Sequence, residues 1–382
     1  MDRTRWDIVA LVFLGGLLSA AQFGKVSLTL PLVAETFDRD LTTVSTLVSM
    51  VGLVGLIFGA IAGGITAAFG PGRTFLTGLL LGGAISLLQA LIPVFTIFAG
   101  SRVIEGFAHL ALVVGGPPLM AAAANDRHRP LVMGLWAVFF GLSFAISAQV
   151  FPAILAAGGL PLLFALHGAA LLILTLVLWH RVPRVPMTRP SIDPVAVHRA
   201  IYTRLRTVAP GLGFVPYTFL FIAALTFLPD ALGAPALAVT LPLASLATTL
   251  LGGALCRRFA PHHVAAAGFA GTILGMFALF AGLPGAAHLA FAAMGIVPGA
   301  SFAAIPHFNA DPGDRARATG AIAQLGNLGT VTGTPLFALL LVWGPGGLIW
   351  ATVTISALGI FLALWSGRAA SGTPSRIVVN VR

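Results

Sequence analysis

Three ionisable side chains lie in one apolar stretch of the sequence. The segment SRVIEGFAHLALVVGGPP, residues 101–118, carries Arg102, Glu105 and His109. Their spacings of three, four and seven residues place all three on one face of a helix. A charged side chain at the centre of a membrane costs about 2.5–3.5 kcal/mol on insertion scales, so such residues face a bundle interior or a wet cavity. The pattern predicts an ionic site inside a membrane domain.

The only lysine of the chain, Lys25, also lies in an apolar segment, LSAAQFGKVSLTLP. Polar residues surround it at roughly helical spacing, namely Ser19, Gln22 and Thr29. At 1.5 Å per residue, Lys25 lies near the depth of Arg102 and Glu105. Together these three charges leave a surplus of one positive charge, which favours binding of an anion. Two alternatives remain open: Lys25 extends to the outer surface, or it pairs with Glu105 and binds no solute.

Glu105 and His109 lie one helical turn apart and are candidate proton sites, because intramembrane carboxylates and histidines often carry protons in transporters. A packing role for His109, and a purely structural Arg102–Glu105 pair, are the alternatives.

Four further polar or aromatic residues within apolar runs either contact a solute or pack between helices: Trp136, Tyr217, Gln324 and Asn327.

Composition places these residues in a membrane protein. Of 382 residues, 58% are hydrophobic and 8% are charged, whereas soluble domains carry about a quarter charged residues. One cysteine, Cys256, excludes an intramolecular disulfide and a multi-cysteine metal site. We expect neither a bound metal nor a cofactor. The basic residues lie in short connections between apolar runs, which argues against nucleic acid as a partner.

Twelve apolar runs are long enough to cross a membrane. We expect spans over 7–35, 41–68, 73–93, 96–123, 130–156, 160–180, 209–230, 236–258, 263–283, 286–307, 316–342 and 345–366. The first run is too long for a cleaved signal peptide and predicts an anchor that is retained.

Loop charges predict the orientation. Of the twenty-one basic residues, Lys25 and Arg102 lie within spans and Arg39 lies in an outer loop. The other eighteen fall on one side if the N-terminus is cytoplasmic, as the positive-inside rule requires. Both termini are then cytoplasmic.

One long basic connection divides the spans into six and six. We expect an N-terminal bundle over 1–180, a linker over 181–208, a C-terminal bundle over 209–366 and a cytoplasmic tail over 367–382. Within the linker, Asp193 and Pro194 are typical of a helix start. An apolar face then predicts a short amphipathic helix on the inner membrane surface; its residues are Val197, Ile201 and Leu205.

The two halves share a local repeat. GGITAAFGP at 63–71 and GALCRRFAP at 253–261 align at an offset of 190 residues, which matches Phe69 with Phe259 and Pro71 with Pro261. Parallel repeats of six spans are typical of transporters.

With these features the chain resembles the major facilitator superfamily. The resemblance implies an all-α membrane protein of twelve helices in two six-helix bundles, related by a pseudo-two-fold axis along the membrane normal. It also implies that helices 1 and 4 line a central cavity. The family's R-x-x-Q-G motif on helix 4 corresponds to residues 102–106, with glutamate in place of glutamine.

The family's G-x-L-A-D-R-x-G-R loop corresponds to the run that begins at Gly63, with Gly70 and Arg73 as further gating-loop candidates. Ala67 replaces the aspartate that helps to latch the inner gate in the family, so that role does not carry over. Residues 134–149 keep Gly134 and Gly141 but lack the Gly-Pro signature of drug antiporters.

The combined hypothesis is a secondary active transporter that moves a small organic anion across a bacterial inner membrane by alternating access. It is proton-coupled, surrounded by lipid and complete as a monomer. The alternatives are an efflux carrier for amphipathic compounds and a non-transporting sensor on the same fold. An enzyme is not expected, because H-E-x-x-H and Ser-His-Asp patterns are missing from the sequence. A P-loop is missing too, so the energy for transport would come from an ion gradient and not from ATP.

Overall fold

The computed structural model describes residues 3–183, 185, 187 and 193–372. The end of the expected tail, 373–382, and the linker residues 184, 186 and 188–192 lie outside the described residues. The helices are α1 (Trp6–Ser27), α2 (Leu30–Phe37), α3 (Leu41–Phe69), α4 (Pro71–Ala90), α5 (Phe95–Ala123), α6 (Arg129–Ala137), α7 (Phe139–Leu178), α8 (Pro194–Tyr202), α9 (Leu205–Ala231), α10 (Leu237–Leu255), α11 (Pro261–Phe280), α12 (Ala286–Phe308), α13 (Pro312–Leu340), the 3₁₀ turn η1 (Leu341–Trp343) and α14 (Gly344–Gly372).

Twelve membrane crossings are present among the described residues. Ten segments are long and apolar enough to cross a membrane, and two of them contain two crossings each. One is α7, which bends at Gly158 and Gly159; the other is α13 with α14, which η1 separates. Gly159 has φ +63°, a conformation that residues with a side chain rarely adopt, so this position needs glycine. The expected fold class is confirmed.

Two expected spans are each broken once. The first span, expected as continuous over 7–35, ends at Ser27 and restarts at Leu30, where Pro31 occupies the first turn. Proline lacks the backbone N–H that would continue the ladder, so the break has a sequence cause. The span expected over 130–156 is divided into α6 and α7 at Val138, and no glycine or proline marks that break.

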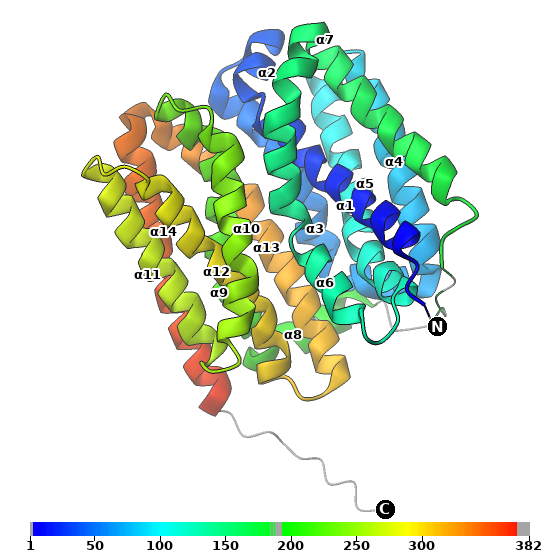
Figure 1. The fold of residues 1–382 in the computed structure, drawn as a ribbon, viewed down its shortest axis with the longest axis vertical. Helices are drawn as coiled ribbons and strands as arrows, with labels where there is room; N and C mark the ends of the chain where they lie inside the picture. The colour runs from blue at the N-terminus through cyan, green and yellow to red at the C-terminus, as the bar shows by residue number, and fades with distance from the viewer. Residues whose placement is uncertain (1–2, 184, 186, 188–192, 373–382) are drawn as a thin grey trace, which may run out of the picture.

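The helices of the two halves pack by the same scheme (Figure 1). In the N-terminal bundle α4 packs on α5 and α7, α3 packs on α5, and α1 packs on α5 and α7. In the C-terminal bundle α11 packs on α12 and α14, α10 on α12, and α9 on α12 and α14. The matched pairs are what a pseudo-two-fold relation between the bundles produces.

The bundles meet along α3 with α13 and along α7 with α10. We call the side that carries the N-terminus, α8 and the α3–α4 turn the linker side; it lies at the bottom of Figure 1. Toward this side α3 and α13 come into backbone contact, since a Cβ on Gly59 would lie 3.1 Å from the backbone nitrogen of Gln324. On the opposite, far side a pocket of about 240 Å³ separates the bundles, lined by Leu30, Pro31, Leu41, Thr226, Phe227, Asp230, Ala231 and Leu341.

The sequence repeat corresponds to two equivalent helix starts. Pro71 begins α4 and Pro261 begins α11, and both helices have 20 residues. The residue that follows the proline is small in one half, Gly72, and large in the other, His262. A Cβ on Gly72 would lie 2.6 Å from Val182, whereas in the other half His262 is the large residue and packs on Gly367.

The linker helix α8 begins directly after Asp193, as expected, but it ends at Tyr202, so Leu205 of the expected apolar face lies at the start of α9. The Asp193 side chain accepts hydrogen bonds from the backbone nitrogens of Val195 and Ala196. The apolar face that we expected on the membrane surface packs on the protein instead: Ile201 is fully buried against Ala321 and Val208. Ala60 of α3 also packs on these residues, so α8 contacts both bundles.

Candidate functional site

Lys25, Arg102 and Glu105 form a buried ionic cluster in the N-terminal bundle. All three side chains are fully buried. The Lys25 Nζ lies 2.6 Å from one carboxylate oxygen of Glu105, and Arg102 pairs with the other. Arg102 also donates to the backbone oxygens of Leu47 (3.0 Å) and Gln22 (2.8 Å). One carboxylate on α5 is thus shared between a lysine on α1 and an arginine on its own helix.

Residues from α4 complete the hydrogen bonding of the cluster. Lys25 donates to Ser86 Oγ (3.0 Å) and Gln89 Oε1 (2.7 Å). Gln89 donates to Glu105 Oε2 (2.9 Å) and Ser101 Oγ (3.0 Å). A buried charge is tolerated only when it is paired and hydrogen-bonded, and these contacts supply both conditions.

The cluster continues to α7 through His167. Its Nδ1 lies 3.0 Å from Ser86 Oγ, and its Nε2 lies 2.9 Å from the backbone oxygen of Leu18. Because a carbonyl can only accept, Nε2 carries a hydrogen. The Phe164 ring lies 4.8 Å from Lys25 Nζ. The connected groups therefore join α1, α4, α5 and α7.

Sequence analysis missed Ser86, Gln89 and His167. The available signal was the same one that identified Lys25: polar residues inside apolar spans, with Ser86 and Gln89 three residues apart on one face of their helix. Lys25 and Glu105 are paired, which is the alternative that the sequence left open. A role of Lys25, Gln22 and Arg102 in solute binding stays a prediction.

Gln22 and His109 lie next to the cluster. Both polar atoms of the Gln22 amide are buried, with no hydrogen-bond partner among the described residues, and the side chain packs against Gly82. His109 Nδ1 lies 2.9 Å from Ser19 Oγ and 3.0 Å from the Ser19 backbone oxygen. The edge of its ring meets Phe23 at 4.9 Å. The hydrogen bonds of His109 therefore go to Ser19 on α1; its role in proton coupling stays a prediction.

Trp136 and Tyr217 lie in different environments. Trp136 is buried in the N-terminal bundle, where Gly16 and Gly116 make room for its indole ring and Phe139 stacks on it at 4.8 Å. Tyr217, which is half-buried, is 5.4 Å from Phe221, and Phe221 contacts the opposite bundle. Of these two candidates, Tyr217 is the one near the bundle interface.

Gln324 and Asn327 lie on α13 where it meets α3. Asn327 packs against Gly55, and its Nδ2 donates to the Ala323 oxygen at 2.7 Å. Gln324 donates to the Leu56 oxygen at 2.8 Å. Both residues therefore hold the bundles together, whatever their contact with a solute.

Of the expected gating-loop residues, Gly63 lies within α3, Gly70 lies at the turn between α3 and α4, and Arg73 lies in α4. Gly63 has nothing near its missing Cβ, and Arg73 lies in the first turn of α4. Gly70 has φ +93° and faces Met187 of the linker. A gating role for the three residues stays a prediction.

A continuous row of aromatic rings crosses the interface between the bundles. Phe23 lies 5.9 Å from Phe140, and Phe140 lies 5.3 Å from Phe144. Phe221 of the C-terminal bundle is 6.4 Å from both Phe140 and Phe144 and stands beside Tyr217. We call these five residues, Phe23, Phe140, Phe144, Tyr217 and Phe221, the aromatic bridge. Ring centroids at these separations are within the range of favourable aromatic contacts.

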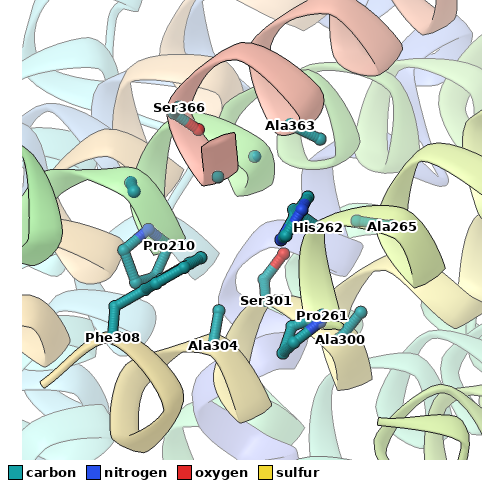
Figure 2. Close-up of a pocket in the computed structure, with 13 residues that line it drawn as sticks. Pro210, Pro261, His262, Ala265, Ala300, Ser301, Ala304, Phe308, Ala363 and Ser366 are labelled. Atoms are coloured by element: carbon teal, nitrogen blue, oxygen red, sulfur yellow. The ribbon is translucent and has the colours of Figure 1, made fainter. Parts of the chain in front are cut away.

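A second, smaller pocket lies at the linker-side end of the C-terminal bundle. His262 and Ser301 point toward one another in it (Figure 2), and neither His262 Nδ1 nor Ser301 Oγ has a partner among the described residues. The volume of about 20 Å³ is room for a single water molecule. This pocket is separate from the ionic cluster, which lies in the other bundle.

The family model of the Major Facilitator Superfamily matches residues 12–231. The chain belongs to the major facilitator superfamily. No curated protein matches the sequence. As a member of the major facilitator superfamily it is a multi-pass membrane protein and a secondary transporter that works by alternating access, and not an enzyme.

Solved structures agree with the fold of this superfamily. A bacterial homolog of the human lysosomal transporter Spinster, in an inward-facing and occupied conformation, aligns with a TM-score of 0.69 at 16% identity over 97% of each chain. The xylose transporter XylE from E. coli, in a partially occluded inward-open conformation, aligns with a TM-score of 0.72 at 18% identity over 94% of this chain and 98% of that chain. At these identities the likeness concerns the fold and not the solute.

Proposed function

We propose that the protein is a proton-coupled carrier for an amphipathic organic solute. The observation that supports this solute class is that aromatic side chains lie at the interface between the bundles, whereas the charged side chains lie inside one bundle. The interface carries the aromatic bridge, in which Phe140 and Tyr217 are half-buried and Phe144 and Phe221 are buried. The charges of the cluster are paired among themselves inside one bundle. Aromatic rings offer a large apolar contact area to a solute.

A small organic anion is the second candidate. It is favoured by the formal charge of the cluster, since Lys25 and Arg102 share the single carboxylate of Glu105. A surplus positive charge in a low-dielectric environment raises the local concentration of anions. To bind Lys25, an anion would have to displace the carboxylate of Glu105. Breaking this ion pair costs free energy, which argues against the anion.

Proton coupling would act through Glu105. A proton on its carboxylate removes the negative charge that binds both Lys25 on α1 and Arg102 on α5. Lys25 would keep its hydrogen bonds to Ser86 and Gln89 on α4 and its contact with the Phe164 ring on α7. Protonation would therefore weaken the attachment of α1 to α5, and α1 also carries Phe23 of the aromatic bridge.

The linker side would face the cytoplasm of a bacterial inner membrane, with a monomer as the working unit. The described helix ends on this side carry basic residues such as Arg73, Arg129 and Arg257, while Glu35 and Asp40 lie on the far side. This distribution is the one that the positive-inside rule describes. Both bundles come from one chain, so a second copy is not needed to complete the carrier.

Thermal stabilisation of the purified protein tests the solute class. We expect tetraphenylphosphonium and 4-phenylbutanol to raise the melting temperature, because a ligand that binds the folded state stabilises it by mass action, by about 2.7 kcal/mol at a hundred times Kd. Phe221→Ala should abolish the shift and Lys25→Gln should retain it. A shift with benzoate alone, lost in Lys25→Gln, would overturn the amphipathic solute in favour of the anion.

A further inference from the structure

The side chain of Gln324 joins three separate parts of the protein. Its Nε2 donates to the backbone oxygen of Leu56 on α3, at 2.8 Å. The same nitrogen lies 2.9 Å from His198 Nε2 on α8. Its Oε1 accepts from the Tyr202 hydroxyl on α8, at 2.8 Å. One amide on α13 thus connects the N-terminal bundle, the C-terminal bundle and the linker helix.

Donors and acceptors match throughout this group. His198 Nδ1 lies 2.7 Å from the backbone oxygen of Pro194, so Nδ1 carries the ring hydrogen and Nε2 is the acceptor for Gln324. Partial burial raises the pKa of Tyr202, which keeps its hydroxyl protonated and able to donate. Both hydrogens of the amide and its oxygen are therefore used, and Gln324 itself is 8% exposed.

Apolar packing holds α8 at the same place. Ile201 is fully buried in a cluster with Val208 and Ala321, and Ala60 of α3 packs against this cluster. The backbones of α3 and α13 approach closely here, since a Cβ on Gly320 would lie 3.1 Å from the Ala60 oxygen. The packing site of Ile201, which we call the seat of α8, therefore takes Val208 and Ala321 from the C-terminal bundle and Ala60 from the N-terminal bundle. It is complete only while α3 and α13 are together on the linker side.

We propose that α8 is a third component of the linker-side gate, held closed by Gln324, Tyr202 and His198. When the bundles separate on this side, the Leu56 oxygen moves away from Gln324 and the seat of Ile201 divides. Because α8 is tied to α13 by two contacts and to α3 by packing, its release and the opening of the gate are one event. The linker thus acts on the transport equilibrium in addition to joining the two bundles.

Cysteine accessibility tests this proposal without a solute, so its result does not depend on the proposed function. The starting protein, which we call the parent, carries two substitutions. Cys256→Ala removes the one free cysteine, and Ala321→Cys places a new thiol at a position that is fully buried beneath α8. The purified full-length protein in lipid nanodiscs is treated with a membrane-impermeant maleimide. We expect Tyr202→Phe, which removes one hydroxyl, to increase the labelling rate by about fivefold, the effect of one ordinary hydrogen bond.

Gln324→Leu removes all three contacts and should increase the rate further. The matched control is Thr203→Val, because the Thr203 hydroxyl bonds only locally, to the Arg199 oxygen of α8; it should label at the parent rate. If Tyr202→Phe and Gln324→Leu both label at the parent rate, or if Thr203→Val labels as fast as Tyr202→Phe, the proposal is wrong. Tyr202→Phe decides the question even if Gln324→Leu does not fold, since it removes a single oxygen atom from a half-exposed ring.

Discussion

Glu105→Gln is expected to destabilise the purified protein by about 3–5 kcal/mol, because it leaves two buried cations without a counter-charge. In the native cluster the carboxylate pairs with both Lys25 and Arg102, and all three side chains are fully buried. A neutral amide can accept hydrogen bonds from the two cations but cannot offset their charge. Denaturation of the detergent-solubilised protein, followed by loss of the monodisperse species, measures the change.

Lys25→Met is the matched control for this prediction. It removes one cation and leaves Arg102 and Glu105 as a neutral pair, so its effect should be the smaller of the two. Adding Lys25→Met to Glu105→Gln should restore part of the lost stability, since only Arg102 then remains unpaired, with its bonds to the Leu47 and Gln22 oxygens intact. A double variant no more stable than Glu105→Gln alone would show that charge is not the reason for the loss.

The double variant also tests proton coupling. If Glu105 carries the coupled proton, a folded Glu105→Gln/Lys25→Met protein in proteoliposomes should bind solute without moving protons. Solute-driven pH change across the vesicle membrane is the readout. Wild-type proton movement in this variant would assign coupling to another group.

Gly299→Val is expected to abolish the folded protein. A Cβ at this position on α12 would overlap the backbone oxygen of Thr249 and lie 2.7 Å from the backbone nitrogen of Gly253 on α10. Gly295, one turn earlier, meets the Ser245 oxygen in the same way. Small residues four apart let membrane helices approach backbone to backbone, and backbone atoms cannot move aside as side chains do. The cost should exceed the ~3 kcal/mol of ordinary overpacking.

The control is Gly63→Val, because a Cβ added to Gly63 would have no neighbouring atom within 4 Å. We expect normal expression and an unchanged melting temperature for this variant, while Gly299→Val yields no monodisperse protein on size exclusion. A Gly299→Val protein with the melting temperature of the wild type would mean that α10 and α12 do not pack closely in the membrane.

The overall fold could be predicted from the sequence because apolar length and loop charge depend only on local residues. The break at Pro31 has a local cause, whereas the break at Val138 has none in the sequence. The pairing of Lys25 with Glu105 could be proposed from depth along two helices, but not decided, because depth does not fix the direction in which a side chain points. Ser86 and His167 were missed since single polar residues in apolar spans are usually packing residues.

Gln324 shows a different limit of sequence analysis. Its partners Leu56, His198 and Tyr202 lie more than a hundred residues away along the chain, and one of them is a backbone carbonyl that no side-chain pattern reveals. The apolar face of α8 could be read correctly as amphipathic. Whether that face meets lipid or protein depends on where the two bundles lie, which only the structure shows.

The two equivalent helix starts at Pro71 and Pro261 are packed in opposite ways. The small Gly72 faces Val182 in one half, whereas the large His262 faces Gly367 in the other. A large residue introduced alone at Gly72 or Gly367 would collide with its neighbour. Each of these residues therefore fits only together with the partner in its own bundle. A segment copied from one half into the other would arrive without its partner.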